Sequence, residues 1–220
     1  MKKVGVEESV VKVLAGTVTL EGNLVIPEGA KGIVLFAHGS GSSRHSPRNR
    51  YVAQVLQKAG LATLLFDLLT IKEEEVDMFT LEHRFNIDLL AQRLVGATDW
   101  ILQNPATKNL RIGYFGASTG ASAALVAAAE RPDVVGAVVS RGGRPDLAGD
   151  ALLNVKAPTL LIVGGEDYPV IDMNKEALEK LRAEKKLVLV PGATHLFEEP
   201  GTLEEVARLA TEWFKHHLSA

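Results

Sequence analysis

Residues 113–122 of this 220-residue chain read GYFGASTGAS, with three glycines around two serines. The apolar run RIGYF precedes Gly116, and an alanine-rich helical stretch follows Gly120. Gly116, Ser118 and Gly120 fit the spacing G-x-S-x-G, in which a sharp strand-to-helix turn exposes the serine hydroxyl. Both glycines suit such a turn because a side chain at either position would collide across it. The stretch therefore predicts a nucleophile, Ser118, at the positive end of a helix dipole.

Two other interpretations of this stretch remain open at the level of the sequence. The glycines could serve only to let a helix pack closely on a strand. The stretch could also be a dinucleotide-binding loop, but its glycine spacing does not match G-x-G-x-x-G and it lies in the middle of the chain. The nucleophile is the interpretation that the surrounding strand and helix favour.

Outward from this stretch, apolar runs and helical patterns alternate. A hairpin is expected at 9–27, where two β-rich runs surround a glycine. Further strands are expected at 32–38, 61–67, 110–116, 134–140, 158–165 and 186–192, and helices at 46–60, 81–103, 118–132, 174–184 and 202–218. Apolar strands separated by helices predict an α/β fold with a mostly parallel sheet covered on both faces. The length predicts one domain, residues 1–220.

A serine nucleophile needs a base and an acid that orients the base, in the chain order serine, acid, histidine. Asp167 follows the strand-like run TLLIVGG, and His195 follows LVLVPGA. The carboxyl ends of parallel strands meet at one edge of a sheet, where such folds assemble their sites. The sequence therefore predicts a catalytic triad of Ser118, Asp167 and His195, with Glu166 as the alternative acid.

The segment HGSGSS at 38–43 is expected to hold the oxyanion of the reaction. The amides of Ser40 and Thr119 are the predicted donors, and Gly39 and Gly41 are predicted to let backbone approach the substrate. His38 is expected to be structural, at the end of its strand. A phosphate-binding nest is the alternative, but the segment lacks the Gly-Lys-Ser/Thr ending of a P-loop.

Several charged residues near these motifs leave two interpretations open. Arg44 and Arg141 are predicted to bind an anionic part of the substrate, or else to fix loops through salt bridges, and His45, Arg48 and Arg50 share this ambiguity. The acidic stretch 68–85 is interpreted as a solvated face, with a small flap as the alternative. His216 and His217, on a polar helix end, are not expected to be ligands.

Composition excludes several classes of function. The formal net charge of −3 and a pI near 6.1 give no basic footprint for nucleic acid. The absence of cysteine removes thiolate metal sites and a cysteine nucleophile. No apolar run approaches the roughly 18 residues of a membrane span. We expect a cytoplasmic monomer or homodimer without a membrane partner.

With these residues in place, the chain resembles the α/β-hydrolase superfamily and, within it, the dienelactone hydrolase-like branch. The resemblance rests on FAHGSGSSRHSPRNR, GYFGASTGA, VGGEDYPV and PGATHLFEEPG. It implies an eight-stranded sheet, a reaction at Ser118, and neither a metal nor an organic cofactor. The founding members use a cysteine nucleophile where this chain has serine, so their lactone specificity is not transferred.

The predicted function is that of a serine hydrolase that cleaves carboxylic esters, with short acyl chains or small lactone-like rings, through an acyl-enzyme. A small-molecule ester is the expected partner. Residues 141–157 are too few to hold a cap domain between the strands they connect. A non-catalytic binding module and an acyltransferase with the same triad are the alternatives.

Overall fold

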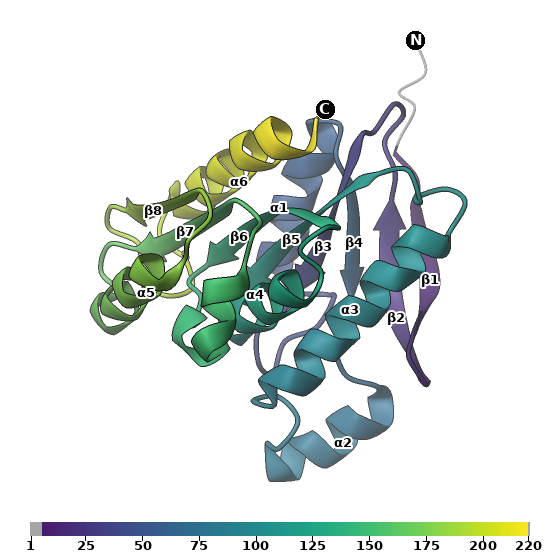
Figure 1. Ribbon diagram of the computed structural model, residues 1–220, viewed down its shortest axis with the longest axis horizontal. Helices are drawn as coiled ribbons and strands as arrows, with labels where there is room; N and C mark the ends of the chain where they lie inside the picture. The colour runs from purple at the N-terminus through teal and green to yellow at the C-terminus, as the bar shows by residue number, and fades with distance from the viewer. Residues whose placement is uncertain (1–5, 220) are drawn as a thin grey trace.

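The computed structural model describes residues 6–219, which form an eight-stranded sheet with helices on both faces (Figure 1). The predicted domain, 1–220, also includes residues 1–5 and 220, which lie outside the described residues. The strands are β1 (Glu8–Ala15), β2 (Val18–Val25), β3 (Gly32–Ala37), β4 (Ala62–Phe66), β5 (Arg111–Ala117), β6 (Val135–Arg141), β7 (Thr159–Gly164) and β8 (Lys185–Val190). The helices are α1 (Pro47–Lys58), α2 (Ile71–Thr80), α3 (Ile87–Gln103), α4 (Thr119–Glu130), α5 (Tyr168–Lys180) and α6 (Thr202–Leu218), with a 3₁₀ helix at Pro145–Asn154.

The sheet is mostly parallel, as the alternating pattern predicts. Its strand order is β1-β2-β4-β3-β5-β6-β7-β8. Strand β2 pairs antiparallel with both β1 and β4, and every other neighbouring pair is parallel. The predicted hairpin is therefore confirmed. The connection from β6 to β7 contains only the 3₁₀ helix, which packs against α4 and α5.

Two apolar layers hold the helices against the sheet. Side chains of α3, α4 and α5 pack with one face of the strands, and those of α1 and α6 pack with the other face (Figure 1). Strands β3 and β5 lie at the centre and are buried on both faces. Because both faces are covered, the loops at the strand ends are what the sheet presents for chemistry.

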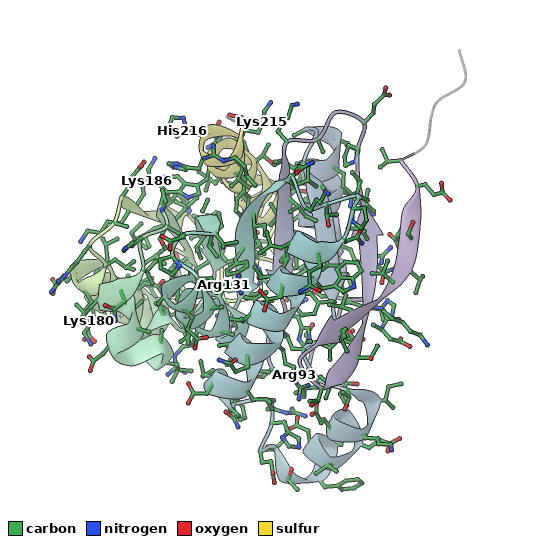
Figure 2. The ribbon with its side chains drawn as sticks, turned by 45° about the vertical axis from the view of Figure 1, so that its right-hand side comes forward. Arg93, Arg131, Lys180, Lys186, Lys215 and His216 are labelled. Atoms are coloured by element: carbon green, nitrogen blue, oxygen red, sulfur yellow. The ribbon has the colours of Figure 1, made fainter. Side chains whose placement is uncertain are left out.

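Helix α2 is the main departure from the expected elements. The interpretation of residues 68–85 as a solvated acidic face is wrong in part. Thr70 and Glu73 form a capping box that starts the helix. Glu73 then binds Arg93 of α3 at 2.6 and 2.7 Å, and Asp77 binds Arg84 at 2.6 Å. Figure 2 shows Arg93 on the stretch of α3 nearest to α2.

The exposed side of α2 carries apolar side chains beside Lys72 and Glu75. Exposed side chains on and after the helix include Ile71, Val76, Met78, Phe79, Leu81 and Phe85. Glu73 and Asp77 can face inward because Arg93 of α3 and Arg84 of the following segment neutralise them, whereas Glu75 is exposed. As a result, α2 stands beside the sheet as a small flap next to the loop after β3 (Figure 1).

Helix α5 begins earlier than the periodicity predicts, at Tyr168, with Pro169 in its first turn. Proline is well tolerated there because the amide it lacks would have no partner within the helix. This start places Asp167 at the N-cap position, where its side chain makes no capping hydrogen bond. Within residues 6–219, no helix is both long enough and apolar enough to cross a bilayer.

Candidate active site

Ser118 lies in a strained turn between β5 and α4. Its backbone has φ 52° and ψ −122°, a conformation that costs a side-chain-bearing residue of the order of 1–3 kcal/mol. A Cβ added at Gly116 would lie 2.4 Å from Ala121 Cα, and one at Gly120 would lie 2.1 Å from the carbonyl oxygen of Ala37. Only glycine fits at either position. The turn therefore has the geometry that the G-x-S-x-G spacing predicts.

Asp167 and His195 come from neighbouring loops that are bonded to each other. The loop after β7 approaches the loop after β8, where the amide of Glu166 donates to Ala193 O at 3.0 Å. His195 Nδ1 then lies 2.7 Å from Asp167 Oδ2. We assign the proton to Nδ1 because an ionised carboxylate only accepts. This tautomer leaves the lone pair on Nε2, as a general base requires.

Glu166, the alternative acid, is bonded elsewhere. Its Oε2 accepts a hydrogen bond from the hydroxyl of Tyr168 at 2.6 Å. Of the two adjacent carboxylates, only that of Asp167 contacts His195 among the described residues. The geometry favours Asp167 as the orienting acid.

Ser118 and His195 lie on either side of the chain segment that leaves β6. The amide of Ser118 donates to Arg141 O at 3.2 Å. A Cβ on the next residue, Gly142, would lie 3.2 Å from His195 O and 3.6 Å from His195 Cε1. No hydrogen bond joins Ser118 Oγ to His195 within residues 6–219. Such bonds are often long without substrate and shorten when it binds.

Two hydrogen bonds and one buried side chain hold the loop that carries His195 in place. Arg48 Nε donates to Leu196 O at 2.8 Å, and the amide of Thr194 donates to Glu199 Oε1 at 3.1 Å. Phe197 is buried at a positive φ of 54°, which is rare for a bulky residue. The imidazole is thus positioned by contacts that no local sequence pattern predicts.

The predicted oxyanion residues are close together but partly engaged with each other. Thr119 is the first residue of α4, where an amide has no acceptor within its own helix. The amide of Ser40 donates to Thr119 Oγ1 at 3.0 Å, and the two hydroxyl oxygens lie 2.7 Å apart. Ser40 Oγ donates to Arg84 O at 2.9 Å. An oxyanion would therefore have to share the Ser40 amide with the Thr119 hydroxyl.

A cavity of about 420 Å³ opens beside this loop. Gly39 and Gly41 line it, and a Cβ at Gly39 would lie 3.3 Å from Ser118 Cβ. Ser118 and His195 are not among the residues that line the cavity, which extends from the loop after β3 towards α2. Its lining is mixed: the apolar side chains include Leu68, Leu69, Met78 and Leu90, and the polar ones include Ser42, Ser43, His45, Glu74 and Arg84.

Arg44 is surrounded by partners. Its amide donates to Asp67 Oδ1 at 2.8 Å, and its guanidinium binds Asp67, Glu21 at 3.0 Å and Asn23 at 2.9 Å. These contacts tie the loop after β3 to β2 and to the end of β4. They favour loop fixation over the predicted contact with substrate.

His38 forms two hydrogen bonds beneath the oxyanion loop. Nδ1 donates to Gly39 O at 2.9 Å, and Nε2 accepts from the amide of Leu68 at 3.0 Å. Burial lowers the pKa of His38 against the opposing effects of the Gly39 bond and of Asp67. The neutral ring is what this pair of bonds needs, because a protonated ring cannot accept. These are the contacts of a structural residue.

We expect the free energy of unfolding to fall as the pH drops below about 6.5, where an unfolded histidine takes up a proton. The buried ring of His38 takes up its proton only at lower pH, so the unfolded chain binds more protons in this interval. Urea unfolding between pH 8 and pH 5 measures the slope. His38→Gln should flatten part of it, whereas exposed His45→Gln should not. Equal slopes for wild type and His38→Gln would contradict the assignment.

Two arginines, Arg84 and Arg141, lie near the candidate site and differ in how far the sequence predicts their role. The backbone oxygen of Arg84 accepts from the Ser40 hydroxyl and the residue lines the cavity, but no local pattern predicts this role because Arg84 lies 44 residues from Ser40. Arg141 is among the residues predicted from the sequence, and its side chain is buried without an ion-pair partner in the described part of the chain. Within residues 6–219, no cluster of three or more His, Cys, Asp or Glu could hold a metal ion.

Comparison with known proteins agrees with this fold. The family model described as the dienelactone hydrolase family matches residues 20–218. A solved dienelactone hydrolase from Anabaena variabilis is 69% identical, covers 97% of this chain and 99% of its own, and has a TM-score of 0.96. A Pyrococcus furiosus esterase, 21% identical with a TM-score of 0.79, covers 97% of this chain and 92% of its own and shares the fold.

Two curated Mycobacterium tuberculosis proteins, from two strains, are also similar. Both are named "Putative phosphoribosyl transferase" and are 61% identical over 208 residues, which is 94% of this chain and 46% of theirs. The chain thus spans less than half the length of these relatives. The family match covers nearly the whole α/β sheet and all three residues of the predicted triad. This chain belongs to the dienelactone hydrolase family.

Proposed function

We propose that this protein is a serine hydrolase that cleaves small carboxylic esters through an acyl-enzyme intermediate. The observation that carries the proposal is the strained turn at Ser118, at the same sheet edge as the 2.7 Å pair of His195 and Asp167. Strain of this kind persists where the surrounding structure maintains it, and it clusters at functional sites. Family membership and the esterase fold support the same class of reaction.

In the proposed reaction, Ser118 Oγ attacks the ester carbonyl carbon while its proton passes to His195 Nε2. Asp167 accepts from Nδ1 and stabilises the imidazolium. The leaving alcohol takes the proton from Nε2, and a water molecule then hydrolyses the acyl-enzyme by the same route. The amide of Thr119 would stabilise the oxyanion. The amide of Ser40 would do so as well, while still donating to the Thr119 hydroxyl.

Covalent labelling tests the proposal directly. A fluorophosphonate should modify wild-type protein once, at Ser118, and should leave Ser118→Ala unmodified, as intact mass and peptide mapping would report. A folded wild-type protein that stays unlabelled would instead favour a non-catalytic binding module. Because an acyltransferase would also be labelled, products formed with and without an added alcohol must be compared.

The name of the Mycobacterium tuberculosis relatives suggests a different activity. More than half of each of those proteins lies outside the match, so the name describes a longer molecule. The residues of this chain that support a reaction are those of a hydrolase. We therefore propose ester hydrolysis for this chain, and we do not propose phosphoribosyl transfer for it.

We expect kcat/KM for p-nitrophenyl esters to peak at about two to four acyl carbons, because methylenes left in solvent do not gain the roughly 0.8 kcal/mol of full burial. In the cavity of about 420 Å³ beside Gly39, the apolar side chains of the lining are those of Pro47, Leu68, Leu69, Met78 and Leu90, and polar residues outnumber them. A panel of acyl chain lengths measures this. A maximum at about twelve carbons would mean that exposed apolar residues of α2, such as Met78 and Phe79, close over the chain.

A further inference from the structure

Strand β1 ends the eight-stranded sheet and has one free edge. It pairs with β2 on one side, and within the part of the chain that the structure describes no strand lies on its other side (Figure 1). Backbone N–H and C=O groups that point to such an edge lack ladder partners, so they offer a template for another strand. The eight residues of Glu8–Ala15 are enough for a strand of ordinary length.

The two faces of β1 differ in what covers them. One face, which includes Val13 and Ala15, is buried in the apolar layer under α3. The opposite face is exposed to solvent and consists of Glu8, Val10, Lys12 and Leu14, with Val6 just before the strand. At its middle, Val10 is 75% exposed. An exposed apolar face on an edge strand favours pairing with another chain.

The two charged residues of this face are unequally paired. Glu8 is bound by Asn23 at 2.5 Å and by Arg50 at 3.4 Å, yet its side chain is still 40% exposed. Lys12 has no ion pair or hydrogen bond among residues 6–219. Glu21 opposes Lys12 in the register of β1 and β2, but it forms its ion pair with the loop after β3. An unpaired lysine therefore lies four residues from a carboxylate that can still be reached.

Two copies of β1 can pair antiparallel only about certain positions. In a continuous sheet both copies keep their exposed faces on one side, and directly opposite side chains share a face. A two-fold axis must therefore pass through a residue and not between two residues. With the axis at Val10, each Glu8 opposes Lys12 of the other copy. Val10 then opposes its own copy, and Val6 opposes Leu14.

Neighbouring registers match this face poorly. An axis at Ser9 sets Glu8 against Val10, and an axis at Val11 sets Val10 against Lys12. An axis at Lys12 brings the two lysines together, and like charges directly opposite each other destabilise strand pairing. Among these registers, only the axis at Val10 sets charge against countercharge and apolar side chain against apolar side chain.

The other end of the sheet is protected against such pairing. Strand β8 begins with Lys185 and Lys186, and Pro191 follows it directly. Lysine and proline on an edge strand hinder the approach of another strand. The sequence of β8 contains no carboxylate that could offset the two charges of a second copy. Of the two ends of the sheet, β1 is therefore the one that fits a second copy.

We propose that two copies of this chain associate through β1 about a two-fold axis at Val10 and join their sheets into one. The same patch is used by both copies, so the contact closes on itself and leaves no free β1 edge. Antiparallel pairing turns the second sheet by half a turn in its plane. The strand ends that carry Ser118 then open on opposite sides, so activity per chain should not depend on association. The proposal is independent of the proposed ester hydrolysis.

Charge reversal tests the register. One strand pair buries less than the roughly 1,200 Å² of a standard interface, so we expect sedimentation equilibrium to show a wild-type dimer that dissociates in the micromolar range. Lys12→Glu would set two carboxylates against each other at both symmetric positions and should raise Kd by about 10- to 100-fold. Lys186→Glu, the same change on β8, is the control and should leave Kd unchanged.

A second reversal should rescue the first. The double variant Glu8→Lys/Lys12→Glu restores opposite charges and should lower Kd again by about 10- to 100-fold relative to Lys12→Glu. Because Glu8→Lys also loses the contacts with Asn23 and Arg50, the urea midpoint must show that the double variant is folded. A folded double variant that dimerises no better than Lys12→Glu would contradict the register.

The apolar centre of the contact supplies an independent test. Val10→Lys places two lysines at the axis and should abolish the dimer, while the urea midpoint changes little because Val10 is exposed. Phe79→Lys is the matched control, since Phe79 is 87% exposed but lies on α2. A dimer that Phe79→Lys dissociates and Val10→Lys does not would assign the contact to α2 and overturn the proposal.

Hydrogen exchange locates the contact directly. Amides on the free edge of Glu8–Ala15 should exchange more slowly at high protein concentration than at low concentration, because they gain acceptors in the second copy. Exchange in Ile71–Thr80 should not depend on concentration. A wild-type protein that stays monomeric up to about 200 µM, or a dimer without slower exchange in β1, would overturn the proposal.

Discussion

Ser118→Ala is expected to lower kcat/KM for a short acyl ester by about 10⁵- to 10⁶-fold, the loss that follows removal of a triad nucleophile. The backbone turn at Ser118 is maintained by Gly116 and Gly120, whose missing side chains make room for Ala121 and for the end of β3. The hydroxyl is therefore not needed for the fold. The variant should unfold at the same urea concentration as the wild type.

Initial rates with a p-nitrophenyl acetate series, corrected for spontaneous hydrolysis, measure this loss. Ser122→Ala is the matched control, because Ser122 is the other serine of the quoted stretch and its hydroxyl donates to Arg144 O. We expect it to retain activity within about tenfold. If folded Ser118→Ala kept most of the activity, the nucleophile would have to be sought elsewhere.

Asp167→Asn should lower kcat by about 10⁴-fold, because the amide would hold His195 in the wrong tautomer. In the wild type, Nδ1 lies 2.7 Å from the carboxylate and carries the proton, which leaves Nε2 free to accept the proton of Ser118. An asparagine can turn an N–H₂ towards Nδ1, and the proton then moves to Nε2. Single-turnover acylation rates would isolate this step.

The neighbouring carboxylate supplies the control for that substitution. Glu166→Gln preserves shape, and Glu166 is bonded to the hydroxyl of Tyr168 and not to the imidazole. We expect less than a threefold change in kcat, within the small effect of an exposed charge. The reverse result, with Glu166→Gln the inactive variant, would assign the orienting role to the alternative acid.

The parallel sheet and the strained turn could be predicted because both depend on local patterns. Apolar runs of strand length alternate with helical spacing, and this alternation by itself favours a covered parallel sheet. Gly116 and Gly120 lie within two residues of Ser118, so their steric effect on the turn can be predicted from the sequence. The start of α2 also depends on a local pattern, the capping box of Thr70 and Glu73, which lies beside the acidic run.

Asp167 and His195 represent an intermediate case. Each follows its own strand, and the rule that active-site residues gather at the carboxyl ends of strands places them at one edge. Their 2.7 Å contact depends on the bond between the loops after β7 and β8, which no local pattern predicts. The sequence could therefore name the pair but could not distinguish Asp167 from Glu166 by contact.

The sequence by itself determined the sheet, the turn at Ser118 and the order of the three candidate catalytic residues, because these follow from periodicity, glycine sterics and strand ends. Only the tertiary structure decided how the charges are paired. Arg44 and Arg141 are both arginines after a strand, yet one meets Asp67 and Glu21 and the other meets no carboxylate among the described residues. The amide of Ser40 likewise finds its acceptor 79 residues away. The strength of a charge pair depends on separations of about 4 Å and on exclusion of water. Both are properties of packing between distant segments.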